Sequence, residues 1–213
     1  PAWGKEDGGW HEGPNYWSMA TGALFDALVT LSDISADRIN VWEEPLLLRM
    51  AEFVGKVHIA GDYYVNFADA KPIVRPDPAV VYEMGRRFGS DRLVKMSGAI
   101  ESRLAPETAF EKIRLLQRIL GYLEAVQGIR AVENQQFPDH REVWLEDGQI
   151  AVGRGNRLYF AAKGGHNDTS HNHNDVGSFV VYGDGQPLLI DVGVGTYTKK
   201  TFDPQQRYTI WTM

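Results

Sequence analysis

The spacing of the apolar residues changes near residue 138, and this change limits the possible folds more than any other feature of the sequence. Before it, apolar side chains recur at helical spacing, most regularly over residues 105–128. After it, short apolar runs are separated by glycine-containing turns, a pattern typical of antiparallel strands. A run of helices followed by a run of strands indicates segregated layers or separate domains rather than β-α-β units. We therefore predict an α+β protein, with a helical domain over residues 1–138 and a strand domain over residues 139–213.

The predicted elements follow from local patterns on either side of this boundary. Helices are expected from about Asn15 to Leu31, after Pro45, and over residues 79–88, 91–97 and 105–128. Strands are expected over residues 142–145, 150–155 and 158–162. A hairpin is expected where Asp184-Gly185 separates apolar runs at residues 179–182 and 187–190, because this pair supplies the positive φ angles of a tight turn.

The composition excludes several classes of protein. Hydrophobic residues make up 43% of the chain, enough for a sizeable core, and no stretch approaches the ~20 apolar residues of a transmembrane helix. The net charge of −6 argues against a protein that binds nucleic acid through its phosphates. The absence of cysteine excludes disulfides, thiol catalysis and Cys-based zinc sites. The chain starts without Met or a signal peptide and ends in an apolar run, so we expect an internal piece of a longer protein.

The most polar stretch of the chain, residues 164–177, holds three of the six histidines. His171 and His173 are two residues apart, so in an extended segment both imidazoles point to one side. Imidazole and carboxylate are common zinc ligands, and Asp191 follows on the return arm of the hairpin. The stretch indicates either a zinc site made by these three residues or a polar loop whose Asn and Asp side chains satisfy its own turns.

The register of the hairpin constrains the zinc hypothesis. A two-residue turn at Asp184-Gly185 places Asp191 opposite Ser178 rather than opposite His173. On a straight strand, at ~3.3 Å per residue, His173 would lie about 16 Å farther along. The two side chains can therefore meet only if the chain doubles back before the hairpin, which Gly177 permits.

A second candidate site lies in residues 7–17, where a glycine-rich loop leads into a predicted helix. Tyr16 stands at the helix start, near Glu12, Trp10 and Trp17. A tyrosine ordinarily has a pKa near ~10, so it needs a positive or hydrogen-bonding neighbour to act as a base. The histidine-rich loop could supply that neighbour. The alternative is that this segment has a purely structural role.

Taken together, these stretches resemble the heparinase II/III-like polysaccharide lyases. The resemblance rests on residues 7–17, 65–69, 171–179 and 185–193, with Tyr197-Thr198 and Arg207-Tyr208. It implies an incomplete α/α toroid followed by an antiparallel β-sandwich that is truncated in this chain. It also implies cleavage of a uronate-containing polysaccharide by β-elimination. A periplasmic or secreted location follows, because such polymers lie outside the cytoplasm.

The resemblance also implies roles for individual residues. Tyr16 and His171 correspond to the catalytic tyrosine and histidine, which share the acid and base roles. His173 and Asp191 correspond to two ligands of a structural zinc, whose third ligand is expected beyond the end of the chain. The family's carboxylate-neutralising asparagine is expected upstream of the chain, so the piece alone should be inactive. Substrate contacts are expected from Trp10, Glu12, Trp17, Asn174, Arg207 and Tyr208.

Two other functions compete with this one. The sequence His171-x-His173-x-Asp175 partly matches the HxHxD pattern of zinc hydrolases, although Val176 follows where that pattern has a histidine. The other alternative is a non-catalytic carbohydrate-binding scaffold. The expected partner is an acidic polysaccharide, with glycosaminoglycan and alginate both open, and the sequence does not indicate an oligomeric state.

Overall fold

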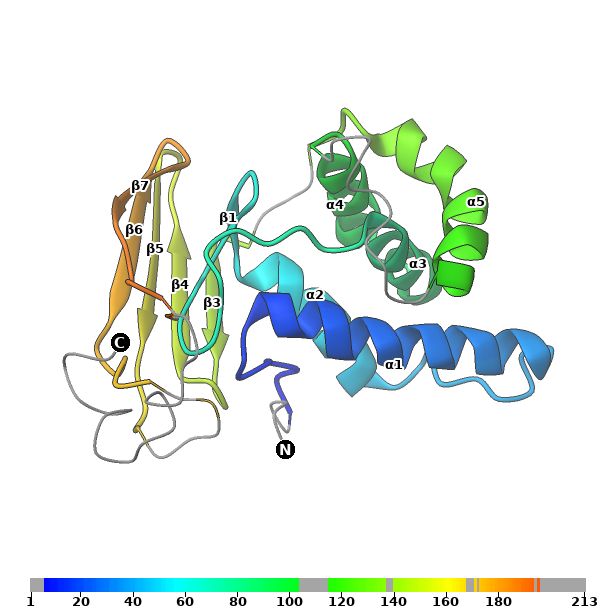
Figure 1. Ribbon diagram of the computed structural model, residues 1–213, viewed down its shortest axis with the longest axis horizontal. Coiled ribbons are helices and arrows are strands. Elements are labelled where there is room, and N and C mark those ends of the chain that lie inside the picture. The colour runs from blue at the N-terminus through cyan, green and yellow to red at the C-terminus, as the bar shows by residue number, and fades with distance from the viewer. Residues whose placement is uncertain are drawn as a thin grey trace.

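The computed structural model describes residues 6–103, 115–136, 140–167, 171, 173–193 and 195. Figure 1 shows helices gathered on one side of the molecule and a sheet on the other, which confirms the predicted α+β class. The described helices are α1 (Pro14–Ile34), α2 (Pro45–Lys56), α3 (Pro78–Phe88), α4 (Asp91–Glu101) and α5 (Leu115–Val132). The described strands are β1 (His58–Ala60), β2 (Tyr63–Tyr64), β3 (Glu142–Leu145), β4 (Ile150–Arg154), β5 (Leu158–Lys163), β6 (Phe179–Gly183) and β7 (Gln186–Leu189).

Proline and a capping carboxylate define the start of two helices. Pro45 opens α2, and the side chain of Glu44 accepts a hydrogen bond from a first-turn N–H group. Pro78 opens α3, where Asp77 has the same role. The chain leaves α3 at Gly89, whose φ of 65° is the left-handed conformation that commonly ends helices. Because these signals are local, α2 begins at the predicted proline and α3 agrees with its predicted limits to within one residue.

Helix α5 differs from its prediction. It continues past Gly128 to Val132, and residues 104–114 lie outside the described part of the chain. A Cβ atom at Gly128 would lie 1.9 Å from the hydroxyl of Tyr82 on α3. The glycine therefore serves the close approach of two helices and does not end the helix.

The five strands β3 to β7 form one antiparallel sheet in which every strand pairs with its neighbour in sequence. The predicted hairpin turn is present between β6 and β7, with φ angles of 50° at Asp184 and 76° at Gly185. Side chains alternate between two faces. Val180 and Tyr182 are buried on the inner face, whereas Phe179 is exposed on the outer face.

One hydrophobic core runs through the helical part and the sheet. Trp17 of α1 and Phe53 of α2 belong to the same cluster of buried side chains as Tyr159 and Val180 of the sheet. The five-stranded sheet follows the helices along the chain, as predicted, but β1 and β2 lie between α2 and α3, and the helices and the sheet share their packing. This shared core places the start of α1 beside the loops of the sheet, and in Figure 1 the N-terminal end of α1 points toward the sheet.

Arg154 of β4 adds directed bonds to this packing. Its Nη1 and Nη2 atoms donate hydrogen bonds to the carbonyl oxygens of Ile59 (2.7 Å) and His58 (2.6 Å). Its guanidinium carbon lies 4.8 Å from the centre of the Tyr159 ring. Charge-assisted hydrogen bonds with fixed geometry therefore hold β1 against the sheet.

The outer face of the sheet is apolar and exposed. Trp144, Phe160 and Phe179 are 54%, 43% and 46% exposed, and each lies on a different strand. A second sheet that would cover this face is not among the described residues, so the predicted sandwich and toroid stay predictions. No described helix combines the length and apolar character needed to cross a membrane.

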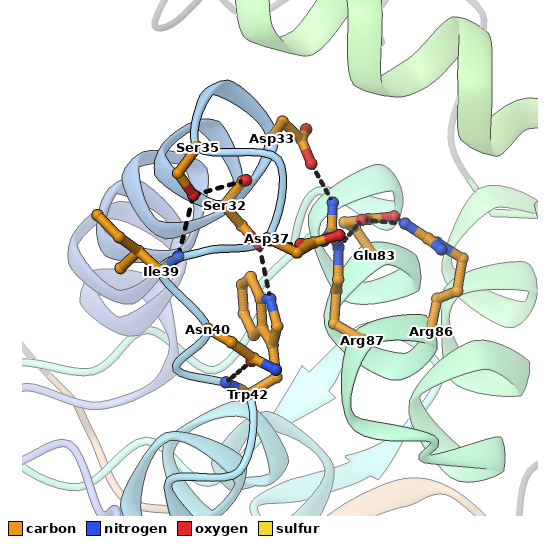
Figure 2. A network of polar contacts seen from close by, with 10 residues as sticks. All are labelled: Ser32, Asp33, Ser35, Asp37, Ile39, Asn40, Trp42, Glu83, Arg86 and Arg87. Atoms are coloured by element: carbon orange, nitrogen blue, oxygen red, sulfur yellow. Dashed lines mark hydrogen bonds and ion pairs between the residues drawn. The ribbon is translucent and has the colours of Figure 1, made fainter.

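A charged network joins the end of α1 to α3 (Figure 2). Arg87 donates hydrogen bonds to Asp33 and Glu83, each at 2.7 Å, and its Nη1 atom lies 3.7 Å from Asp37. The guanidinium also lies over the ring of Trp42, 5.3 Å from its centre. This network closes the far end of α1, away from the sheet.

Candidate functional site

A cluster of imidazoles and carboxylates lies where the helical part meets the loops of the sheet. Nδ1 of His171 lies 3.1 Å from Oε1 of Glu12 and 3.2 Å from Oδ2 of Asp69. The other oxygen of Asp69, Oδ1, lies 3.0 Å from Nε2 of His173. The Asp69 carboxylate is nearly buried, whereas the ring of His171 is 35% exposed. One carboxylate thus contacts both imidazoles, and His171 stays open to the surface.

Three distant segments build this cluster. Glu12 comes from the turn before α1, Asp69 from the segment after β2, and the histidines from the loop between β5 and β6. His171 has a φ of 59°, a left-handed conformation that few non-glycine residues adopt. A local strain of this kind persists only where surrounding contacts hold it, and it is common at functional sites.

The contacts define which ring nitrogen carries the proton. An ionised carboxylate can only accept hydrogen bonds, so a neutral His171 bonded to Glu12 and Asp69 carries its proton on Nδ1. Its Nε2, on the other side of the ring, is then the basic nitrogen. In His173 the bond to Asp69 places the proton on Nε2 instead. His171 is therefore arranged to accept or return a proton through Nε2, as a general acid-base requires.

Tyr16 lies in the first turn of α1, four residues after Glu12. Its side chain is half-buried and packs against the core. The next residue back, Asn15, accepts a hydrogen bond from the backbone N–H of Lys71 at 3.0 Å. The described residues show no hydrogen bond between Tyr16 and His171. The structure thus brings the turn that carries Tyr16 to the segment that holds His171.

The two tryptophans expected to contact sugar are buried. Trp17 is 1% exposed and donates its indole N–H to the carbonyl oxygen of Met50 at 2.7 Å. Trp10 is 5% exposed and donates to Oε2 of Glu12 at 3.2 Å. A ring enclosed on both faces cannot stack on a ligand, so this burial corrects the expectation for both residues. Trp10 instead holds the carboxylate that faces His171.

Of the other four expected substrate contacts, the structure describes Asn174 and Glu12. Asn174 is half-buried in the loop that carries the histidines, and Glu12 contacts His171 directly. Arg207 and Tyr208 lie outside the described residues.

The carboxylate of Asp191 accepts hydrogen bonds from neighbouring groups of its own hairpin. Its Oδ2 atom accepts a hydrogen bond from the hydroxyl of Ser178, and Oδ1 accepts from the N–H of Gly193 at 2.7 Å. The pairing follows the predicted register at Tyr182 and Gly183, but a bulge between Val181 and Tyr182 shifts it by one residue beyond them. The side chains of Ser178 and Asp191 are nevertheless in contact. Asp191 is therefore oriented by groups of its own hairpin.

The described residues do not complete a zinc site. Within them, no three His, Cys, Asp or Glu side chains are arranged to hold a metal ion. His173 is bonded to Asp69, and Asp191 to Ser178 and Gly193. A hydrolase site in which His171, His173 and Asp175 share one metal receives no support from this part of the chain. Any zinc bound by His173 and Asp191 needs further donors from outside the described residues.

Two aspartates beside the histidines were not assigned to the lyase site, and Asp175 entered the sequence analysis only through the alternative hydrolase pattern. Asp69 belongs to a stretch, residues 65–69, that contributed to the family resemblance, but its spacing from the histidines gave no signal. Asp175 is 6% exposed, and its Oδ2 atom accepts a hydrogen bond from the N–H of Ala68 at 2.7 Å. Burial raises the pKa of Asp175, against the opposing effect of this hydrogen bond.

A small cavity lies beside the cluster, between the helical part and the sheet. Its volume is about 30 Å³, and its walls include Trp10, His11, Ala68 and Lys163. Burial lowers the pKa of both His11 and Lys163, because it disfavours their charged forms. The Lys163 ammonium donates a hydrogen bond to the carbonyl oxygen of Gly148 at 2.7 Å. The cavity has room for ordered water but not for a sugar.

Residues 138–211 match the family described as Heparinase II/III-like, C-terminal. The resemblance seen in the sequence is confirmed. A solved structure named Heparinase III-BT4657 gene product has a TM-score of 0.62 to this chain at 18% sequence identity. The match covers 96% of this chain and 28% of that one. A second structure of the same product, with methylated lysines, gives a TM-score of 0.61 at 17% identity and covers 97% and 28% of the two chains.

This chain therefore spans 28% of the length of the heparinase III structures that it matches. At this level of identity the structural likeness shows the fold, and the helix-then-strand order of the chain is part of it. No curated protein matches the chain. The heparinase II/III-like match includes the loop with His171 and His173 and both arms of the hairpin.

Proposed function

We propose that this chain is part of a polysaccharide lyase that cleaves a uronate-containing polysaccharide by β-elimination. The observation that carries the proposal is the contact of two carboxylates, Glu12 and Asp69, with Nδ1 of His171. They orient an exposed imidazole with its basic nitrogen away from them. The heparinase II/III-like match of residues 138–211 supports the reaction class.

The chemistry requires a base, a stabiliser and an acid. The proton on C5 of a uronate becomes acidic when the neighbouring carboxylate is neutralised. A base removes this proton, the C4–C5 double bond forms, the C4–O4 bond breaks, and O4 takes up a proton from an acid. Nε2 of His171 and the hydroxyl of Tyr16 share these two roles. Glu12 and Asp69 stabilise the imidazolium that forms when His171 holds the proton.

The carboxylate-neutralising group lies outside this chain in our proposal. We therefore expect residues 1–213 alone to have little or no activity. The chain has a net charge of −6, so the lysines and arginines that attract an acidic polymer are local or lie elsewhere in the protein. An extracellular polymer implies a periplasmic or secreted enzyme.

The finer architecture is also part of the proposal. The sheet is one layer of a β-sandwich, which its exposed apolar outer face supports, and the helices belong to an incomplete toroid. His173 and Asp191 are two ligands of a structural zinc, with the remaining donors outside the described residues. Bound zinc would hold the loop that bears His171, and no step of the reaction depends on it.

A screen of the intact protein against a panel of uronans tests the function. Elimination creates a conjugated, unsaturated uronate, so ultraviolet absorbance should rise with at least one polymer. New reducing ends without that absorbance would show hydrolysis and overturn the proposal. Binding without any cleavage would indicate a carbohydrate-binding scaffold.

A further inference from the structure

The segment after β2 touches both sides of the proposed site. Residues 64–70 are all buried although most of them lie outside helices and strands, so their backbone polar groups need partners. Several of these groups bond within the neighbouring stretch of the chain, and the N–H of Ala68 bonds the carboxylate of Asp175. The side chain of Asn66 and the N–H of Lys71 add bonds to the hairpin arm and to the start of α1. We call residues 66–71 the bridging segment.

Its end contacts the start of α1. The N–H of Lys71 donates a hydrogen bond to Oδ1 of Asn15 at 3.0 Å. Ala70 packs directly against Gly13, the residue before the helix, where an added Cβ atom would lie 2.3 Å from the Cβ of Ala70. Gly13 also has a φ of 83°, which favours glycine. The turn that carries Tyr16 therefore rests on the bridging segment.

Its middle contacts the histidine loop. Asp69 bonds His171 and His173 at 3.2 Å and 3.0 Å. The N–H of Ala68 donates to the buried carboxylate of Asp175 at 2.7 Å, and Ala68, the residue before Asp69, has a left-handed φ of 56°. Every contact joins groups more than a hundred residues apart in sequence.

Its start contacts the hairpin. The Nδ2 atom of Asn66 donates to the carbonyl oxygen of Asp191 at 3.2 Å. A Cβ atom at Gly193 would lie 3.1 Å from the same Nδ2 atom, so the hairpin arm also packs closely here. The bridging segment thus holds the start of α1, the histidine loop and the hairpin arm in one arrangement.

We propose that the bridging segment sets the distance between Tyr16 and His171, with Asp69 as the positioning residue of both imidazoles. The inference rests on the proposed lyase function and deepens it. Acid-base catalysis needs the reacting atoms within hydrogen-bond reach, and a displacement of ~1 Å can cost ~100-fold in rate. The contact of Asn15 with Lys71 and the contact of His171 with Asp69 place the two groups from positions two residues apart in the bridging segment.

The variant Asp69→Asn tests the histidine side of this device. An asparagine can accept a hydrogen bond from only one imidazole and presents an N–H group to the other, so at least one of the two hydrogen bonds that position the rings is lost. We expect kcat to fall about 100-fold with KM changed less than about threefold, since the Asp69 carboxylate is only 6% exposed and acts through the imidazoles. Isotope-edited NMR of the ring nitrogens, above the ordinary histidine pKa of ~6.5, should show a lost hydrogen bond or a changed tautomer in at least one of the two rings.

The variant Asn15→Ala tests the other side and covers the case in which Asp69→Asn does not fold. It should lower kcat about tenfold while both imidazoles keep the wild-type tautomer, because it removes only the hydrogen bond between Asn15 and Lys71, which fixes the turn that carries Tyr16. Asp62→Asn is the matched control, because this nearby carboxylate bonds Arg75 and Arg103 instead of the histidines. It should leave kcat and both tautomers unchanged.

Two results would overturn the inference: ring-nitrogen signals of both imidazoles that are unchanged in a folded Asp69→Asn protein, or full kcat in Asn15→Ala. Failure of the proposed function is a separate result. If the wild-type protein eliminates none of the uronans, the lyase proposal fails. The ring-nitrogen spectra then still decide whether Asp69 positions His171 and His173.

Discussion

The two ends of α1 carry polar clusters that use similar carboxylates in opposite ways. At its far end, Glu83 and Asp33 bind Arg87, a side chain that keeps its charge at any ordinary pH (Figure 2). At its start, Glu12 and Asp69 face the imidazole of His171, which can gain and lose a proton. The first cluster is suited to holding a shape, and the second to moving a proton.

Burial favours a raised carboxylate pKa near both ends of α1, but the neighbouring groups decide whether the pKa is raised in the end. Burial alone raises the pKa of Glu83, but hydrogen bonds from Arg86 and Arg87 outweigh it and leave the pKa lowered. Burial also raises the pKa of Asp175, and its hydrogen bond with the backbone of Ala68 does not reverse the shift. Two arginines thus reverse the effect of burial on the pKa of Glu83, whereas burial decides the direction of the pKa shift of Asp175.

The largest effect is expected from Tyr16→Phe, which removes only the side-chain hydroxyl of Tyr16, at the end of α1 that lies near the histidine cluster. If this hydroxyl transfers a proton, kcat should fall about 1,000-fold or more while binding of the polysaccharide persists. Absorbance kinetics and calorimetry measure the two quantities. Turnover close to the wild-type rate would remove Tyr16 from the mechanism.

The zinc proposal concerns the same end of the molecule. Asp191→Ala removes a proposed ligand, so zinc affinity of the intact protein should weaken by at least about 100-fold. Elemental analysis after dialysis reads this out without an activity assay. Ser178→Ala is the matched control, because it removes the hydroxyl that donates a hydrogen bond to Asp191 and keeps the Asp191 carboxylate. Equal zinc content in wild type and Asp191→Ala would reject the assignment.

At the far end of α1, Arg87→Met should change stability and not catalysis. It breaks two hydrogen-bonded ion pairs of a guanidinium that is only 14% exposed, which should cost about 2 kcal/mol of unfolding free energy. Denaturant unfolding measures this cost. Arg157→Met, which breaks an exposed pair with Asp184, should leave stability unchanged. A large fall in kcat for Arg87→Met would contradict the division between the clusters.

The smallest effect concerns pH. The pKa of Glu83 is lower in the folded protein than the ordinary ~4.3, so its contribution is complete above that value and is lost as pH falls through the folded pKa. Wild type should therefore lose up to about 1 kcal/mol below pH ~4 that Glu83→Gln does not lose. Unfolding curves over acidic pH compare the two proteins. Parallel losses would show that Glu83 is not the group responsible.

The correct predictions concern features with local causes. Pro45 marks the start of α2, α3 begins within one residue of its predicted start, and Asp184-Gly185 forms the predicted turn. Asp191 was expected opposite Ser178, and their side chains are in contact, although a bulge shifts the strand register by one residue. The predictions that differ from the structure depend on which residues pack together in the fold. Trp17 was expected to contact a sugar and is buried, and the helix expected to end at residue 128 continues past Gly128.

The order of helices and strands, the hairpin and the family resemblance were determined by the sequence alone, because each depends on residues close together in the chain. Tertiary structure decided that Asp69 lies between His171 and His173 and that Trp10 supports Glu12. These contacts join segments about a hundred or more residues apart or depend on the enclosure of a ring, and no local spacing encodes either. These contacts form because the helices and the sheet bury their apolar faces in one core. Polar groups where the helical part meets the loops of the sheet are buried with it and need hydrogen-bond partners from the other part.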